Sequence, residues 1–219
     1  MRLEDSPALD EALRHVLEEF SIADSAYDAA IERTQRYARS LENDREFGVV
    51  GSRIGGSIGK GTAIAPMSDV DLYLYLDDDV WRSMRGGLLS PHTVIGRVRS
   101  RVEKRLCFEI QNGYATIRPQ RHSVGIKFRK ENSVGIDVVP ALVSGRDVEA
   151  ALIPRRPTGM FVETSVERQI ELINALDSPF RYLRRGIRLL KHWNKTAGVG
   201  LHSYIVEVLG MYAAAEGCT

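Results

Sequence analysis

GGSIGKGTAIAPMSDVDLYLYL, residues 55–76, joins a small-residue turn to an apolar strand that carries two carboxylates. Side chains alternate between the two faces of a strand, so we expect Asp69 and Asp71 to point one way while Val70 and Leu72 point into the opposite layer. Two like charges held side by side raise each other's pKa unless a cation lies between them. The pattern therefore indicates a site for a hard divalent ion with oxygen ligands, most simply Mg²⁺.

The turn before this strand indicates a phosphate site. Gly55, Gly56 and Ser57 let a backbone approach closely, and the free N–H groups of a following helix would attract an anion. Each half alone has an ordinary explanation, because a glycine pair is usually a turn and Asp-x-Asp on a strand is often a solvated face. The two halves on neighbouring elements are much more specific. No G-x-x-x-x-G-K-[ST] loop occurs, so this is not a Walker motif.

A third carboxylate lies in a later strand. In SVGIDVVPAL, residues 133–142, Asp137 stands between Ile136 and Val138. A lone carboxylate among Val and Ile side chains is costly to bury without a partner. If this strand lies beside the first one, Asp137 completes a cluster of three carboxylates. The alternative is an aspartate that accepts a bond from a loop N–H at a strand end before Pro140.

Composition places the chain among ordinary soluble proteins, with 43% hydrophobic residues and a net charge of +1. No apolar run approaches the ~20 residues that span a bilayer, and the acidic, amphipathic N-terminus differs from a signal peptide, so we expect a cytoplasmic protein without membrane contact. Cys107 and Cys218 stand far apart, which argues against a disulfide framework or a zinc site. The near-neutral charge makes nucleic acid an unexpected partner, although five cations of the helix expected over 91–106 could contact it.

Hydrophobic periodicity predicts an α+β fold, in which a mixed sheet is backed by helices. Residues 1–145 form the core with its N-terminal helices, and residues 144–162, rich in Pro, Gly and Arg, look like a crossover. Residues 160–219 form an all-helical lobe. The expected helices cover residues 7–20, 24–41, 91–106, 165–176, 179–195 and 203–216. Besides the Asp69 strand, the expected strands cover residues 46–53, 114–118, 123–129 and 135–142.

These motifs together resemble a known superfamily, the DNA polymerase beta-like nucleotidyltransferases. Within it, Lys60-Gly61-Thr62, Ser68-Asp69-Val70-Asp71 and Ile136–Ala141 look like the oligoadenylate synthase and cyclic GMP-AMP synthase branch, and most closely the bacterial CD-NTases of anti-phage signalling. Leu189–Asn194, and Leu201–Tyr204 with Glu207, agree as well. The resemblance covers about residues 20 to 219. Family members usually continue through several more helices, so the lobe is expected to be incomplete.

The resemblance implies a polymerase beta-like core and an enzyme that joins nucleoside triphosphates, as donor and acceptor, into a cyclic di- or trinucleotide or a short oligonucleotide. Pyrophosphate leaves. Asp69, Asp71 and Asp137 are implied as catalytic residues that hold two Mg²⁺ or Mn²⁺ ions. Lys191 and Ser203 would reach the donor triphosphate, and a regulatory protein partner is compatible with the family. The implied nucleotide-binding residues are Gly56, Ser57, Lys60, Lys191, Ser203 and Tyr204, the last by stacking on a base.

Other activities stay open from the residues alone. One is an RNA 3′-end nucleotidyltransferase of the CCA-adding kind, which should show a basic tract. Another is a protein-modifying nucleotidyltransferase, which generally ends soon after its sheet. The third is a non-catalytic nucleotide sensor, which has no need of a third carboxylate. Without the resemblance, Lys191 reads as a snorkelling cation, Trp193 as a packing aromatic and Tyr204 as a core residue.

Overall fold

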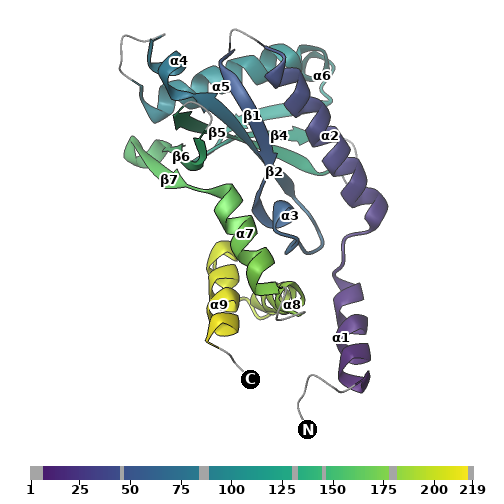
Figure 1. The fold of residues 1–219 in the computed structure, drawn as a ribbon. Helices are drawn as coiled ribbons and strands as arrows, with labels where there is room; N and C mark the ends of the chain where they lie inside the picture. Colours follow the sequence, from purple (N-terminus) through teal and green to yellow (C-terminus); the bar gives the residue numbers. More distant parts are fainter. Residues whose placement is uncertain are drawn as a thin grey trace.

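The structure is a computed structural model that describes residues 7–44, 47–83, 89–129, 133–144, 147–177 and 182–216. A mixed sheet with its covering helices forms the upper body in Figure 1, and a lobe of helices lies below it. The elements in chain order are α1 (Pro7–Glu19), α2 (Asp24–Glu42), β1 (Val49–Ile54), α3 (Gly56–Gly59), β2 (Asp69–Asp77), α4 (Asp78–Ser83), α5 (Pro91–Arg105), α6 (Cys107–Gln111), β3 (Ala115–Pro119), β4 (Val124–Phe128), β5 (Gly135–Ser144), β6 (Asp147–Arg155), η3 (Arg156–Thr158), β7 (Met160–Thr164), α7 (Val166–Asp177), α8 (Leu183–Thr196) and α9 (Ser203–Ala215).

The sheet has the strand order β1-β2-β5-β4-β3, and β6 and β7 extend it from β5. Strands β2 and β5 are parallel, whereas the other pairs are antiparallel. The two strands that carry the predicted carboxylates are therefore neighbours at the centre of the sheet. The α+β fold expected from the sequence is confirmed.

The main core lies between the sheet and helices α2 and α5. Leu72, Leu74 and Leu76 of β2 are almost fully buried there and pack with Val98 of α5 and Leu41 of α2. The intervening side chains of β2 point to the other face of the sheet, as strand alternation requires. Burial of the apolar face thus fixes the direction in which the carboxylates point, because a shift of one residue would bury the charges.

Residues 144–162, expected as a crossover from the sheet to the helical lobe, are largely part of the sheet, and Met160–Thr164, expected within the all-helical lobe, are strand β7. These residues contain the hairpin of β6 and β7, which joins the sheet where Leu152 of β6 pairs with Leu142 of β5. Most side chains of β6 and β7 are exposed or half-buried. A strand without a buried face lacks the apolar alternation by which strands are recognised, which is why the pattern missed it.

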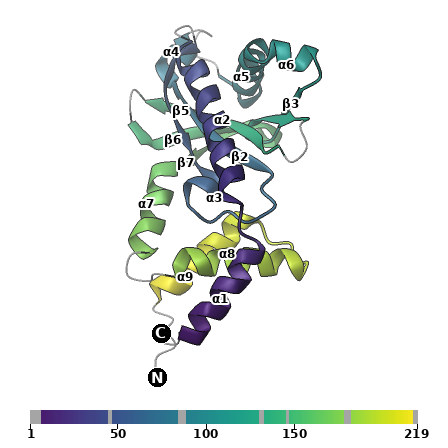
Figure 2. The ribbon, with the colours of Figure 1, turned by 90° about the vertical axis from the view of Figure 1, so that its right-hand side faces the viewer.

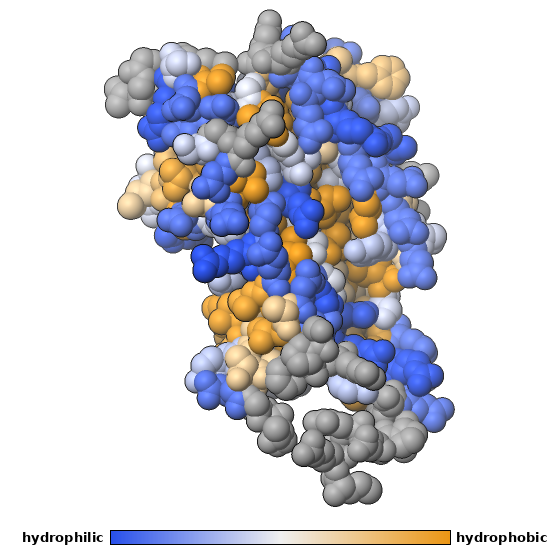
Figure 3. Space-filling model, in the orientation of Figure 1, coloured by the Kyte–Doolittle hydropathy of each residue, from blue (hydrophilic) through white to orange (hydrophobic). Residues whose placement is uncertain are grey.

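Helices α7, α8 and α9 form the helical lobe. Phe20, which directly follows α1, packs against this lobe, because its ring stacks on His192 of α8 with 4.3 Å between centroids. Figure 2 shows α1, α8 and α9 together at the lower end. Helix α9 leaves several apolar side chains exposed, among them Ile205 and Leu209, and Figure 3 shows apolar surface over this part of the lobe. In the described part of the chain, no helix combines the length and apolar character needed to cross a membrane.

Candidate active site

The strand register brings the three predicted carboxylates onto one face of two adjacent strands. Asp71 of β2 lies directly opposite Asp137 of β5, and Asp69 lies opposite Gly135. The juxtaposition expected of Asp137 is therefore found. Among the described residues, no three Asp, Glu, His or Cys side chains are already gathered at the spacing of a metal site, so the carboxylates share a face without converging on one point.

Asp71 fits against the turn because residue 56 has no side chain. Gly56 has a φ of +57°, and a Cβ placed on it would lie 1.7 Å from Oδ2 of Asp71. Asp71 also accepts a backbone bond, from the N–H of Gly55 to its carbonyl oxygen at 2.9 Å. Turn and strand are thus locked together, so the predicted phosphate turn and the predicted metal ligand are in contact.

We expect the substitution Gly56→Ala to destabilise the protein by about 2–3 kcal/mol, because it combines a left-handed backbone with a clash. Urea unfolding would measure this. The matched control is Gly96→Ala in α5, where an added Cβ would meet nothing within 4 Å and should be neutral or stabilising. A cost of Gly56→Ala below ~1 kcal/mol would contradict the packing of Asp71 on this turn.

Asp69 carries the clearest indication of a cation site. Its Oδ1 is buried and has no hydrogen-bond partner in the described part of the chain. The atom occupies space left by Gly135, where a Cβ would lie 2.2 Å from it. Burying a carboxylate oxygen without a hydrogen-bond partner is costly. A hard divalent ion would remove this cost, because it takes carboxylate oxygens as its ligands. Asp69 together with the Asp71–Asp137 pair therefore fits a divalent metal ion.

Asp137 is held by a side chain that sequence patterns did not identify. Gln120, in the loop between β3 and β4, donates from Nε2 to Oδ1 of Asp137 at 2.8 Å and accepts from the Ser123 hydroxyl at 3.2 Å. Burial, with the charges of Asp69 and Asp71, raises the pKa of Asp137 to about 6. Burial also raises the pKa of Asp71, against the opposing charge of Lys60. Three carboxylates crowded in this way favour a bound cation.

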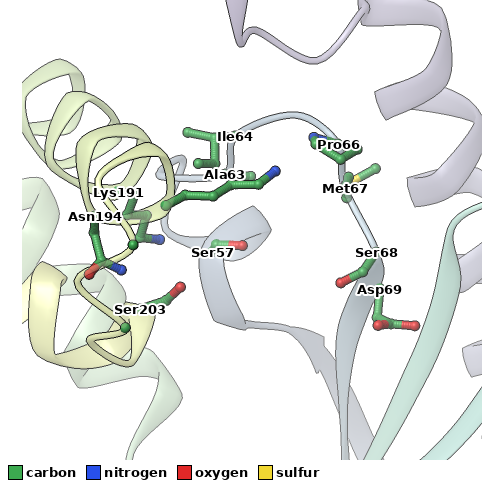
Figure 4. Close-up of a pocket in the computed structure, with 13 residues that line it drawn as sticks. Ser57, Ala63, Ile64, Pro66, Met67, Ser68, Asp69, Lys191, Asn194 and Ser203 are labelled. Carbon is green, nitrogen blue, oxygen red and sulfur yellow. The ribbon is translucent and has the colours of Figure 1, made fainter.

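A cavity of about 440 Å³ lies between the core and the helical lobe, and we call it the interlobe cavity. Ser57 and Asp69 line it from the core, and Lys191, Asn194 and Ser203 line it from the lobe. In Figure 4, Lys191, Asn194 and Ser203 lie on one side of the space and Asp69 on the other, with Ser57 on α3 between them. Four residues predicted from separate motifs, Ser57, Asp69, Lys191 and Ser203, are thus brought to one cavity.

Beside this cavity lies a buried cluster of charges that joins the core to the lobe. Lys191 donates to the carbonyl and hydroxyl oxygens of Thr62, both at 3.1 Å, and to Oε1 of Glu207. Lys60 donates to Oε2 of Glu207, and the Thr62 hydroxyl donates to Oε1 at 2.7 Å. At most 6% of any of these four residues is exposed. We call Lys60, Thr62, Lys191 and Glu207 the charge bridge.

Protonation in the charge bridge follows from this geometry. Burial alone would raise the pKa of Glu207, but the ammonium groups of Lys191 and Lys60 outweigh it and lower the pKa. Burial lowers the pKa of Lys191, and the Glu207 carboxylate opposes that effect. A second carboxylate, that of Asp71, also acts on Lys191, because its negative charge raises the pKa of the lysine. The positive charges of two lysines and the negative charges of Glu207 and Asp71 therefore compensate one another between the lobe and the predicted metal site.

Three predicted nucleotide-binding residues do not line the interlobe cavity: Gly56, which packs against Asp71, Lys60, whose ammonium is held by Glu207, and Tyr204. Tyr204 is 50% exposed, so its alternative reading as a core residue is wrong. Lys191 is buried to its tip, so the snorkelling alternative is wrong as well. The role of Glu207 was not predicted, although a single acidic residue within the apolar segment of α9 is a signal for a buried ion pair. Gln120 lies in a loop and offered no such signal.

Comparison with known proteins identifies a family and a shared fold. The family model described as "Second Messenger Oligonucleotide or Dinucleotide Synthetase domain" matches residues 8–176. A curated relative from Escherichia coli strain MS 115-1, named cyclic AMP-AMP-AMP synthase, is 26% identical over 140 residues, which cover 63% of this chain and 40% of the relative.

Solved structures share the fold. The E. coli MS115-1 CdnC structure with ATP is 21% identical with a TM-score of 0.75, covering 94% of this chain and 65% of that one. The Bradyrhizobium diazoefficiens CD-NTase CdnG, in complex with GTP, is 12% identical with a TM-score of 0.70, covering 97% and 72%. This chain thus spans less than two thirds of the length of its E. coli relative.

Proposed function

The chain belongs to the family of second messenger oligonucleotide or dinucleotide synthetase domains, and on this premise we propose that it is a metal-dependent nucleotidyltransferase. It joins nucleoside triphosphates into a cyclic di- or trinucleotide or a short oligonucleotide, with release of pyrophosphate. The observation that carries the proposal is the direct pairing of Asp71 with Asp137 on adjacent strands, with Asp69 of the same face lining the interlobe cavity. The product would serve as a second messenger in anti-phage signalling.

The proposed roles follow the positions of the side chains. Ser57 and Ser203 face the interlobe cavity from opposite sides and would donate hydrogen bonds to phosphate oxygens. Lys191 would exchange one of its hydrogen bonds to Thr62 for one to a phosphate oxygen. Lys60 would not touch the phosphate, but its positive charge acts on Asp71. The half-exposed ring of Tyr204 is available for stacking on a base.

Asp137 is the proposed acceptor of the proton from the attacking ribose hydroxyl. Its Oδ1 accepts a hydrogen bond from Gln120, which fixes the orientation of the carboxylate, and a general base must lie within hydrogen-bond reach of the proton that it takes up. Two Mg²⁺ or Mn²⁺ ions, held by Asp69, Asp71 and Asp137, would lower the pKa of that hydroxyl and neutralise the charge that develops on pyrophosphate. ATP and GTP, which are present in the structures of two solved relatives, are candidates for donor and acceptor.

A regulatory protein partner is part of the proposal. One solved relative, E. coli MS115-1 CdnC, was determined as a complex with HORMA-deltaN. It is 21% identical to this chain, with a TM-score of 0.72. A partner of that kind is therefore worth testing for this chain.

Incubation with radiolabelled nucleoside triphosphates tests the activity. Each pair of triphosphates is supplied with Mg²⁺ or Mn²⁺, the mixture is treated with phosphatase, and resistant products are identified by mass. Cyclic products have no terminal phosphate and should survive, and a short linear oligomer should survive as its dephosphorylated form. A protein that binds triphosphate but forms no phosphodiester with any pair, with or without the partner, would instead be a sensor.

Binding should depend on the metal. We expect a non-hydrolysable triphosphate with Mg²⁺ or Mn²⁺ to raise the melting temperature far more than the same triphosphate with EDTA, since a ligand that binds only the folded state stabilises it, by about 2.7 kcal/mol at a hundred times its Kd. Differential scanning fluorimetry measures this. Asp69→Asn should remove the metal-dependent part. Equal shifts with and without metal would contradict the proposed site.

A further inference from the structure

A second cavity, of about 940 Å³, lies where α2 and α6 meet the hairpin of β3 and β4. Of the residues that the structure describes, none lines both this cavity and the interlobe cavity. Tyr37 and Phe128 at its base pack against the core between sheet and helices, whereas Asp71 and Asp137 point to the opposite face of the sheet. We call this cavity the arginine pocket, because Arg33, Arg36, Arg105 and Arg129 line it.

The arginine pocket concentrates positive charge in a chain that is nearly neutral. Among the described residues, one carboxylate, Glu109, lines it beside the four arginines, although the whole chain has a net charge of only +1. Arg105 lies 3.4 Å from a carboxylate oxygen of Asp44. For Arg36 and Arg129, the described part of the chain shows no ion pair. These two guanidinium groups are therefore available to an anion from outside.

The base of the pocket is aromatic. The rings of Tyr37 and Phe128 stack with 5.9 Å between centroids, and the Arg33 guanidinium lies 4.9 Å from the centroid of Phe128. Burial, with the charge of Glu109, raises the pKa of Tyr37 to about 12, so the phenol is neutral. Tyr114 also lines the pocket and is 58% exposed. A flat ligand could therefore stack on an open ring while its charged part meets arginine.

Phosphate and a planar base together match this lining. Arginine binds phosphate through a planar fork of N–H donors, and aromatic rings stack on nucleobases with about 1–3 kcal/mol per base. The volume lies within the range of about 300–1,000 Å³ that is usual for small-molecule sites. We propose that the arginine pocket binds a free nucleotide, with phosphate on Arg36 and Arg129 and the base on Tyr114. This site is additional to the proposed active site and does not depend on its activity.

A free nucleotide fits better than a nucleic-acid strand, because two arginines on the neighbouring face of α5 are neutralised. On the neighbouring face of α5, Arg99 pairs with Glu103 at 2.7 Å and Arg101 pairs with Asp44 at 3.1 Å. A strand would need a continuing track of unneutralised cations along its backbone. The arginine pocket is instead a local basic site.

Calorimetric titration with ATP and AMP in EDTA tests the proposal, since the expected active site needs metal. Arg36→Ala/Arg129→Ala should weaken metal-free nucleotide binding at least tenfold, because two charge-assisted contacts are lost. Tyr114→Ala should weaken it as well. The control Arg39→Ala/Lys104→Ala removes the same charge from exposed positions that do not line the pocket and should leave binding unchanged. Asp69→Asn should also leave it unchanged.

Three outcomes would overturn the proposal. The first is no saturable binding of either nucleotide up to about 1 mM, the weakest affinity expected of a built site. The second is an equal loss in the control variant, which would indicate general charge attraction. The third is an oligodeoxyadenylate that binds more tightly with each added nucleotide, which would identify a strand-binding groove. Because turnover is not measured, failure here leaves the proposed nucleotidyl transfer untouched, and failure of transfer leaves this binding site untouched.

Discussion

Asp137→Asn should lower turnover by about 10²–10⁴-fold, the range typical for loss of one general base, and more if a metal is displaced as well. Asparagine keeps the size of the side chain and an oxygen that can still accept the bond from Gln120 at the position of Oδ1. It removes the charge that would hold an ion and take up the hydroxyl proton. Because Ser57 and Lys191 lie on the interlobe cavity, triphosphate binding should survive largely intact.

The same substitution should leave the metal-free protein as stable as before or more stable. The pKa of Asp137 is raised from 3.8 to about 6 in the folded protein, so folding favours the protonated acid. The contribution of Asp137 to stability is therefore present below pH of about 4 and is lost as the pH rises to about 6. Near neutral pH, asparagine avoids this cost, and we expect a gain of up to about 3 kcal/mol.

Three measurements on one variant separate the two roles of Asp137: melting temperature in EDTA, triphosphate affinity and turnover. An aspartate with a purely structural role would give lower stability and a nearly normal rate per folded molecule. The matched control is Asp28→Asn on the exposed side of α2, which should change none of the three. Near-normal turnover of Asp137→Asn would remove the three-carboxylate site from the proposal.

Glu207→Gln should destabilise the protein by about 3–5 kcal/mol, the usual cost of removing one partner from a buried ion pair. Both lysine ammonium groups of the charge bridge donate to Glu207, and glutamine leaves them buried beside a neutral amide. The substitution should also loosen the contact between lobe and core, so that Lys191 is no longer held at the interlobe cavity. Urea unfolding gives the free energy, and triphosphate affinity reports on the lobe.

The exposed residue Glu216, at the end of the same helix, supplies the control. Glu216→Gln should change stability by no more than about 0.5 kcal/mol. In a double-mutant cycle, Lys60→Met should offset part of the loss from Glu207→Gln, because it removes one of the unpaired ammonium groups. A coupling energy of about 0.5–3 kcal/mol is expected for groups in one network. Independent effects would mean that the three charges do not act as a unit.

The carboxylate site could be predicted from the sequence because its strands obey a simple rule. Alternation in β2 places Asp69 and Asp71 opposite the buried leucines, and the apolar run of β5 isolates Asp137. The charge bridge could not be predicted in the same way. Lys60 and Glu207 lie 147 positions apart, and which partner each takes depends on how the lobe docks on the core. Motif resemblance therefore identified Lys60 and Lys191 without showing that Glu207 binds both.

The parallel pairing of β2 with β5 has a consequence for how the site assembles. Strands β3 to β7 pair each with the next in the chain, and β1 pairs with β2, so each group can form from near neighbours. The pairing of β2 with β5 joins the two groups and, among the described strands, is the one pairing between strands distant in the sequence. Asp71 and Asp137 lie on opposite sides of it. Long-range pairings form slowly because loop closure comes first. During refolding, metal-dependent triphosphate binding should therefore return later than the circular dichroism signal of the sheet.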